Sequence, residues 1–162
     1  MEIRPAIVAD ISAIAGIELS AGALFRGTHM DWAVGETTDR SKLSAAVAER
    51  NFWVAGVEGQ LAGFLLAGTS GAAFHISEVA VHQEYRGQRI GAALVEAALV
   101  EAQRRGHGRA TLTTDRALAW NARYYERLGF SVLEPDETPT ELAVILASER
   151  NPHLRCAMTR AL

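Results

Sequence analysis

The sequence has very little cysteine and lysine, and it lacks an excess of positive charge. Cys156 is alone among 162 residues, so the chain can form neither an internal disulfide nor a cysteine-based zinc site. Lys42 is the only lysine, and the formal net charge is −3 at pH 7. A slightly acidic chain has no general attraction for nucleic acids or anionic membranes. We therefore expect no nucleic-acid partner and no membrane partner.

Signals for targeting are also missing. Residues 1–6 contain no basic region followed by an apolar run, so no signal peptide is expected. No stretch approaches the roughly 20 apolar residues of a typical membrane span. Apolar residues make up 49% of the chain and charged residues 22%, which suits one folded domain over residues 1–162. The expected location is the cytoplasm.

The first half of the chain predicts antiparallel strands and two helices. The predicted elements are a strand at 1–4, a helix from Asp10 or Ser12 to about Leu24, a helix at 41–49, and strands at 52–57 and 60–67. Gly56, Glu58 and Gly59 supply the bend of a hairpin between the two later strands, and a turn is expected at 68–71. The irregular segment 25–39 is either a substrate-contacting loop or a loop held to the core by its aromatic side chains.

The second half alternates strands with helices. The predicted elements are a strand at 73–81, a helix at 89–105, a strand at 109–114, a short helix at 120–128, a strand at 130–133, a helix at 141–150 and a strand at 154–160. Cys156 in the last strand is expected to be a small buried thiol. The fold class is α/β (α+β), with a mixed, mostly antiparallel central sheet of six to seven strands flanked by helices.

The turn between the strand at 73–81 and the helix at 89–105 carries the strongest functional signal. Its residues are Arg86, Gly87, Gln88, Arg89, Ile90, Gly91 and Ala92. Glycine takes backbone angles closed to other residues, and the start of a helix presents unpaired N–H groups that an anion can satisfy. The turn has neither the spacing of a P-loop nor that of the dinucleotide-binding fingerprint. Taken alone, it fits a phosphate site and a plain structural turn equally well.

This turn resembles the signature of the GNAT superfamily, the Gcn5-related N-acetyltransferases. The family's motif is Arg/Gln-x-x-Gly-x-Gly/Ala after an apolar strand, and here Arg86 to Gly91 follows Val79, Ala80 and Val81. Arg89 stands where the family usually has its first motif glycine. A backbone contact needs no particular side chain, so the pyrophosphate cradle is expected to survive this departure.

A second match lies about thirty residues further on. The segment WNARYYERLGF, residues 120–130, is similar to the family's Asn-x-x-x-Tyr-Glu-x-Leu-Gly-Phe pattern. The two motifs have the family's order and separation, and the resemblance covers most of the chain. It is least informative in the N-terminal and C-terminal thirds, which vary with the substrate.

The resemblance implies acetyl-CoA as donor, no metal, and an amine acceptor that is either a small molecule or a peptide. The turn at 86–92 would hold the pyrophosphate, and the backbone of Val79, Ala80 and Val81 would pair with the pantetheine arm. Asn121 would help to hold that arm. The family often forms dimers, so a homodimer is one expectation. Two alternatives stay open: a noncatalytic acyl-CoA-binding or sensor module, and a turn that binds another phosphorylated ligand such as a nucleotide.

Amine acetylation needs two proton transfers, because the acceptor must lose a proton and the leaving thiolate gains from receiving one. The resemblance places Tyr125 near the thioester sulfur. Four residues separate Asn121 from Tyr125, so both lie on one helix face, and Tyr125 is the candidate general acid. Tyr124 is the better candidate for packing the helix on the sheet.

The sequence offers two candidates for the general base, both in the strand at 73–81. His75 and Glu78 lie on opposite faces of a regular strand. His75 has a suitable unperturbed pKa, but a lone histidine in an apolar strand is as readily a structural residue. Glu78 could act directly or through water if burial raised its pKa. Glu18 and His29, from the variable part, are further candidates for contacting the amine.

Overall fold

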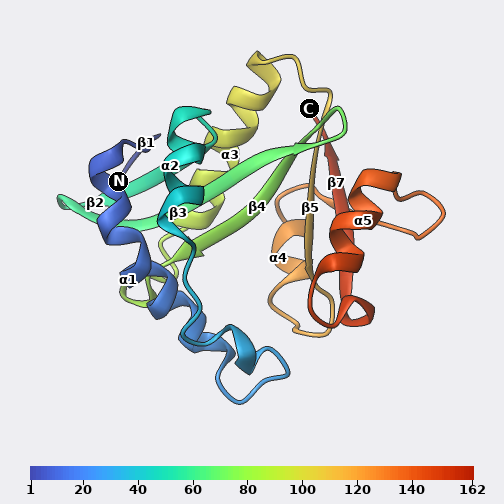
Figure 1. Ribbon diagram of the computed structural model, residues 1–162, viewed down its shortest axis with the longest axis horizontal. Helices are drawn as coiled ribbons and strands as arrows, with labels where there is room; N and C mark the ends of the chain where they lie inside the picture. Colours follow the sequence, from blue (N-terminus) through green and yellow to red (C-terminus); the bar gives the residue numbers. More distant parts are fainter. The chain divides into compact units, whose positions relative to one another are not determined.

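Seven strands form one mixed sheet in the order β1-β2-β3-β4-β5-β7-β6 (Figure 1). The computed structural model describes all residues, 1–162. They pack into two compact units, one of Met1–Ala67 with Glu78–Ala98 and the other of Gly68–Ser77 with Leu99–Leu162. Four of the described strand pairs are antiparallel and one is parallel. The predicted fold class is confirmed, with the larger of the two expected strand numbers.

The elements follow the predicted order closely. The strands are β1 (Glu2–Pro5), β2 (Phe52–Val57), β3 (Gln60–Ser70), β4 (Ala73–Val81), β5 (Arg109–Asp115), β6 (Ser131–Leu133) and β7 (Arg155–Ala161). The α-helices are α1 (Ile11–Gly22), α2 (Arg40–Ala48), α3 (Ile90–Arg104), α4 (Ala122–Glu126) and α5 (Thr140–Ser148). Short 3-10 turns are η1 (Val8–Asp10), η2 (Ala23–Phe25), η3 (Asp31–Ala33), η4 (Gln83–Tyr85) and η5 (Pro152–Leu154).

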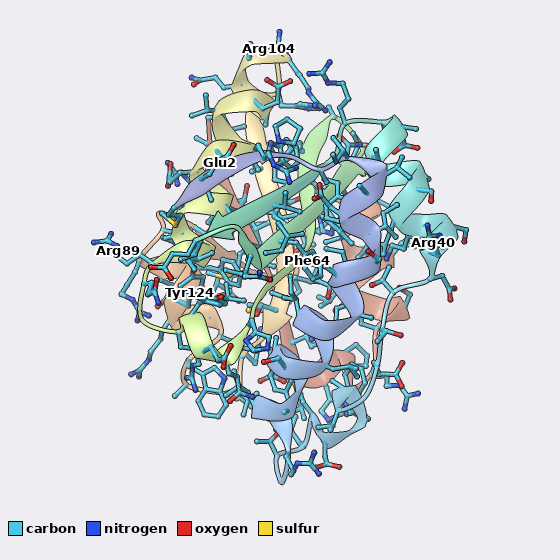
Figure 2. The ribbon with its side chains drawn as sticks, turned by 90° about the vertical axis from the view of Figure 1, so that its left-hand side faces the viewer. Glu2, Arg40, Phe64, Arg89, Arg104 and Tyr124 are labelled. Atoms are coloured by element: carbon cyan, nitrogen blue, oxygen red, sulfur yellow. The ribbon has the colours of Figure 1, made fainter.

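In the first unit, α1 buries an apolar stripe against the sheet. Ile11, Ile14 and Ile17 are at most 4% exposed and join a core that includes Phe64 of β3 (Figure 2). Each such side chain contributes roughly 1.5–3 kcal/mol when fully buried. The start of the helix is fixed by Asp10, whose carboxylate accepts a hydrogen bond of 2.8 Å from the backbone N–H of Ile7 and pairs with the Arg4 guanidinium. Asp10 thus fixes where α1 begins, and the spacing of Ile11, Ile14 and Ile17 determines which face of the helix packs on the sheet.

The hairpin of β2 and β3 forms as predicted, with a bulge at Ala55/Gly56. Glu58 and Gly59 both take positive φ, as a two-residue type I′ turn requires. The turn expected at 68–71 is wrong, because β3 continues to Ser70. Gly71, with φ +58°, is where the chain reverses. Gly68 to Ser70 look like turn residues in the sequence but are held in extended form by pairing along the sheet.

Helix α3 is buried on most of its surface, as its composition predicts. Its seven buried residues are Ile90, Gly91, Leu94, Val95, Ala98, Leu99 and Ala102. On the outer side Glu101 pairs with Arg105 at 2.9 Å and with Arg104 at 2.7 Å. Gly106 follows with φ +88°, a backbone conformation that favours the end of a helix.

In the second unit, β7 is hydrogen-bonded between β5 and β6, antiparallel to both. The first half of β4 runs parallel to β5, with Phe74–Ile76 in register with Ala110–Leu112. Cys156 lies in β7 at 2% exposure, which confirms the prediction of a small buried thiol.

One expectation about apolar segments is wrong. Residues Val8–Phe25 are helical throughout, with a mean hydropathy of 1.5 over 18 residues, so this segment is long and apolar enough to cross a membrane by length and composition. The same segment supplies buried isoleucines to the core of the first unit. A single helix of this kind near the N-terminus is weak evidence for a membrane span, because core helices pass the same test.

Candidate functional site

The turn that precedes α3 has two residues in the left-handed backbone region. Gly87 has φ +81° and Arg89 has φ +60°. The carbonyl of Arg89 accepts a hydrogen bond of 3.0 Å from the N–H of Ala93, so Arg89 is the residue at which the helix begins. Ile90 is 1% exposed and anchors the first helical turn in the core. The start of α3 is therefore fixed, and its first N–H groups have no acceptor within the helix.

Arginine and glycine at the surface complete this turn. Arg86, Gly87, Gln88 and Arg89 are all exposed, whereas Ile90 and Gly91 are buried. Figure 2 shows the Arg89 side chain extending away from the ribbon. Two cations beside the positive end of a helix dipole suit an anionic ligand, and N–H groups at a helix start suit a phosphate. The turn therefore places two arginines at the start of α3, and its role as a pyrophosphate cradle stays a prediction.

The positive φ of Arg89 explains why the family usually has glycine at this position. A residue with a Cβ in the left-handed region is destabilised by roughly 1–2 kcal/mol, and glycine is not. The turn thus keeps its backbone conformation after the glycine has been replaced, and the strain is confined to one exposed residue.

We expect the substitution Arg89→Gly to stabilise the protein by about 1 kcal/mol, because relief of backbone strain outweighs the greater freedom of glycine in the unfolded chain. Urea denaturation measures the change. The matched control is Arg86→Gly, which removes the same charge from a residue with φ −60°. The control should destabilise the protein by roughly 0.5–1 kcal/mol. Equal effects of the two substitutions would show that Arg89 carries no strain.

The second half of β4 lies against β3 at very close range. A Cβ added to Gly63 would come within 2.8 Å of the Ala80 carbonyl oxygen, so β3 needs glycine there. The N–H of His82 donates to the Ala62 carbonyl at 2.8 Å and extends this pairing past the strand end. The register of β4 with β5 lies upstream, at Phe74–Ile76, and does not involve the predicted pantetheine segment Val79–Val81. The importance of Gly63 could not be predicted from the sequence.

Two carboxylates of the first unit meet at one threonine. The backbone N–H of Thr38 donates to both carboxylate oxygens of Glu18, at 2.9 and 3.1 Å. The hydroxyl of Thr38 donates to Oε2 of Glu78 at 3.3 Å. Glu18 comes from α1, Thr38 from the segment before α2, and Glu78 from β4. Glu18 is 6% exposed, and Thr38 and Glu78 are half-buried, so this cluster is partly withdrawn from water.

The environment of Glu78 raises the pKa of its carboxyl from an ordinary 4.5 to about 7. Burial is the main cause, since it penalises the charged form, and the negative charge of Glu18 acts in the same direction. The Thr38 hydrogen bond and the positive charge of Lys42 oppose the rise. A carboxyl group with this pKa can accept and release protons near neutral pH, which is what a general base requires.

His75, the other candidate base, lies in the second unit with a different environment. Its side chain is 7% exposed, and Nδ1 lies 3.0 Å from the hydroxyl of Thr111, its register partner on β5. Burial lowers the pKa of the imidazole and favours its neutral form. These contacts are typical of a structural histidine with a satisfied hydrogen bond.

Helix α4 carries the second sequence motif, and it is shorter than predicted. It runs from Ala122 to Glu126, and Asn121 sits at its N-cap, with its carbonyl accepting from the N–H of Tyr124 at 3.0 Å. The residues before Asn121 form a turn, and Gly129, with φ +83°, follows the helix. The predicted helix at 120–128 is thus correct in position and too long at both ends.

The two tyrosines of α4 stack edge to face, with ring centres 5.2 Å apart. Tyr125 also meets the ring of buried Phe130 at 6.0 Å. Burial raises the pKa of the Tyr124 phenol. The packing role predicted for Tyr124 agrees with that shift, and the orientation of the Tyr125 ring is fixed by two aromatic neighbours.

The segment after α1 projects as a loop (Figure 1), and it is partly tied down. Met30 is 7% exposed, and the N–H of Gly27 donates to the Asp31 carboxylate at 2.7 Å. His29 lies exposed in this loop. Thr38 at its far end contacts both glutamates. The loop therefore anchors itself through Met30 and the Gly27–Asp31 hydrogen bond and also reaches the carboxylate cluster. Its contact with a substrate stays a prediction.

Residues 48–132 match the family model described as Acetyltransferase (GNAT) domain. The chain belongs to the GNAT family. The match spans β2 to β6 and includes both motifs, whereas α1 and Thr38 lie outside it. Membership confirms the resemblance seen in the sequence.

Several solved structures share the GNAT fold along the whole chain. The PaiA N-acetyltransferase of Thermoplasma acidophilum, in complex with coenzyme A, matches with a TM-score of 0.79 and 16% identity, over 99% of this chain and 98% of that one. The N-acetylglutamate synthase of Neisseria gonorrhoeae, complexed with coenzyme A and N-acetyl-glutamate, matches with a TM-score of 0.76 and 20% identity, over 99% of this chain and 35% of that one. The ribosomal-protein-S18-alanine N-acetyltransferase of Escherichia coli matches with a TM-score of 0.69 and 19% identity, over 99% and 92%.

Proposed function

We propose that this GNAT protein transfers an acetyl group from acetyl-CoA to an amine, with Glu78 as general base and Tyr125 as general acid. The observation that carries the proposal is the pKa of the Glu78 carboxyl, which is raised to about 7. Glu78 lies on β4, the strand that leads into the turn at 86–92, which we call the motif turn. Family membership and the coenzyme A complexes of two relatives support the donor. The turn at 86–92 would take the pyrophosphate and the backbone of Val79–Val81 the pantetheine arm.

The chemistry balances without a covalent intermediate on the protein. Glu78, ionised, accepts a proton from the acceptor ammonium, directly or through a water molecule. The free amine nitrogen attacks the thioester carbonyl, a nitrogen–carbon bond forms, and the carbon–sulfur bond breaks. Tyr125 gives its phenolic proton to the leaving sulfur, and the second proton, which the nitrogen loses as the amide forms, returns to the Tyr125 phenolate through solvent. The roles of Asn121 and Tyr125 are carried over from the family's motif, and positioning together with proton transfer supplies the catalysis.

Glu78, half-buried beside Glu18, favours an amine acceptor for an electrostatic reason. At neutral pH an alkylamine is a cation, and it is attracted to a cluster that holds Glu18 and Glu78 together. The same cluster then removes the proton that prevents attack. A small molecule and a peptide N-terminus both satisfy this chemistry.

Calorimetry with acetyl-CoA tests the donor, and we expect submillimolar binding. Pantetheine, which lacks the pyrophosphate, should bind more weakly, because the N–H groups and arginines of the turn would have no anion to satisfy. A thiol-release assay against polyamines, amino acids, aminoglycosides and N-terminal peptides tests turnover. Absence of binding would contradict the proposal. Binding without turnover on the whole panel would favour a noncatalytic acyl-CoA module, and stronger binding of a nucleotide would favour the other alternative.

A further inference from the structure

We propose that Thr38 is a positioning residue, which holds Glu18 beside Glu78 and thereby controls the charge on Glu78. This inference rests on the proposed function, in which Glu78 is the base. Thr38 is separated by 20 residues from Glu18 and by 40 from Glu78, and it is hydrogen-bonded to both. It lies outside the part of the chain that the family model matches.

The two hydrogen bonds of Thr38 have opposite electrostatic consequences. The backbone N–H fixes the carboxylate of Glu18 close to the cluster, and the negative charge of Glu18 favours the protonated form of Glu78. The hydroxyl donates to Glu78 and favours its ionised form. Thr38 therefore acts on Glu78 in two ways: it holds the charge of Glu18, which opposes ionisation of Glu78, and it donates the hydrogen bond that favours this ionisation.

The backbone of α1 is also fixed close to Glu18, at Ser20 two residues later. The backbone N–H of Gln83 donates to the hydroxyl of Ser20 at 3.0 Å, and Nε2 of Gln83 donates to the Ser20 carbonyl at 2.6 Å. Gln83 is the first residue of η4, which leads into the motif turn. The C-terminal end of α1 is thus hydrogen-bonded to the segment after β4, which sets the backbone position from which the Glu18 side chain reaches Thr38.

The remaining charge that acts on Glu78 is Lys42 of α2, which favours the ionised carboxylate. Glu18, Thr38 and Lys42 come from α1, the connecting segment and α2, so three parts of the variable N-terminal region set the state of a residue on β4. Changes in this region can adjust the base to an acceptor without altering the motif turn.

The test uses two variants at position 38 and one at position 18. Thr38→Val removes the hydroxyl and keeps the backbone N–H, so Glu18 stays in place while Glu78 loses a donor. Thr38→Ser keeps the hydroxyl and is the matched control. Glu18→Gln removes the charge, and its side-chain carbonyl can still accept from Thr38. The titration of the Glu78 carboxyl carbon is followed by NMR in each intact protein, without ligands.

We expect the midpoint of the Glu78 titration to rise by about 0.5–1 pH unit in Thr38→Val, because the carboxylate loses a hydrogen-bond donor. The lower value is favoured, since 3.3 Å is long for a hydrogen bond from a hydroxyl group. The midpoint should be unchanged in Thr38→Ser and fall by about one unit in Glu18→Gln. A midpoint that stays in place in Thr38→Val, or moves equally in Thr38→Ser, overturns the inference.

The pH profile of kcat/KM separates this inference from the proposed function. If Glu78 is the base, Thr38→Val should lower kcat/KM by about three- to tenfold at pH 6 and leave it unchanged at pH 9, where Glu78 is ionised in both proteins. A merely structural role of Thr38 would lower the rate equally at both pH values and overturns the inference. A shifted NMR midpoint with an unshifted rate profile supports the role of Thr38 and removes Glu78 as base.

Discussion

The substitution Glu78→Gln should lower kcat by about two to four orders of magnitude and leave the affinity for acetyl-CoA unchanged. Glutamine keeps the size of the side chain and its hydrogen bond with Thr38, but it cannot accept a proton from the acceptor. In the unmodified protein the acid limb of the kcat/KM profile should have its midpoint at about 7, the pKa of Glu78, with activity increasing as the pH rises. Steady-state kinetics from pH 5 to pH 9 measures both effects.

The loss of activity should be accompanied by a gain in stability, which excludes unfolding as its cause. A pKa raised from 4.5 to about 7 means that the folded protein binds more protons than the unfolded chain between these two values. Ionisation of Glu78 therefore costs stability as the pH rises through this window, and the cost is complete above it. Glu78→Gln removes the cost, so the variant should be more stable by about 2 kcal/mol at pH 8 and by nothing at pH 4.

Two further variants separate Glu78 from its competitors. Glu58→Gln, at the exposed tip of the β2–β3 hairpin, changes the net charge equally and should leave the rate unchanged. His75→Gln should lower stability, because the buried contact with Thr111 is lost, and should keep the midpoint of the acid limb at about 7. A profile in which His75→Gln abolishes the acid limb and Glu78→Gln retains it would assign the base to His75 instead.

Most of the scaffold could be predicted because its signals are local. The range of β4, the β2–β3 hairpin and the buried sides of α3 follow from apolar spacing and from glycine at the turns. The motif turn is local as well, and its position follows from a few consecutive residues. Where local signals conflict, as at Gly68 to Ser70, pairing along the sheet prevails over turn propensity.

The carboxylate cluster could not be predicted because it is assembled from distant parts of the chain. Thr38 stands in an irregular segment with no periodicity, and nothing in its neighbours indicates that its N–H and hydroxyl lie on two glutamates. The sequence makes Glu18 a candidate for contacting the acceptor amine, and nothing in it places Glu18 beside Glu78. The backbone of Arg89 is an intermediate case: the sequence marks the residue as unusual, and only the structure shows that it adopts the left-handed conformation that glycine would.

The substitution Tyr125→Phe should lower kcat by about a hundredfold, with little change in the affinity for acetyl-CoA. A tyrosine hydroxyl close to the leaving sulfur can give its proton to a departing thiolate. Phenylalanine keeps the ring contacts with Tyr124 and Phe130, so the helix should retain its packing. Pre-steady-state measurement of thiol release, together with calorimetry, separates the chemical step from binding.

Tyr124→Phe is the matched control, because it removes a hydroxyl from the neighbouring ring of the same helix. We expect little change in turnover, since the Tyr124 side chain is assigned to packing; an equal loss in both variants would remove the special role of Tyr125. An acyl donor with a more acidic leaving thiol gives the decisive comparison. A weakly basic thiolate gains less from a proton, so the deficit of Tyr125→Phe should shrink with such a donor. If Tyr125 served only to pack α4, the deficit would be the same for every leaving group.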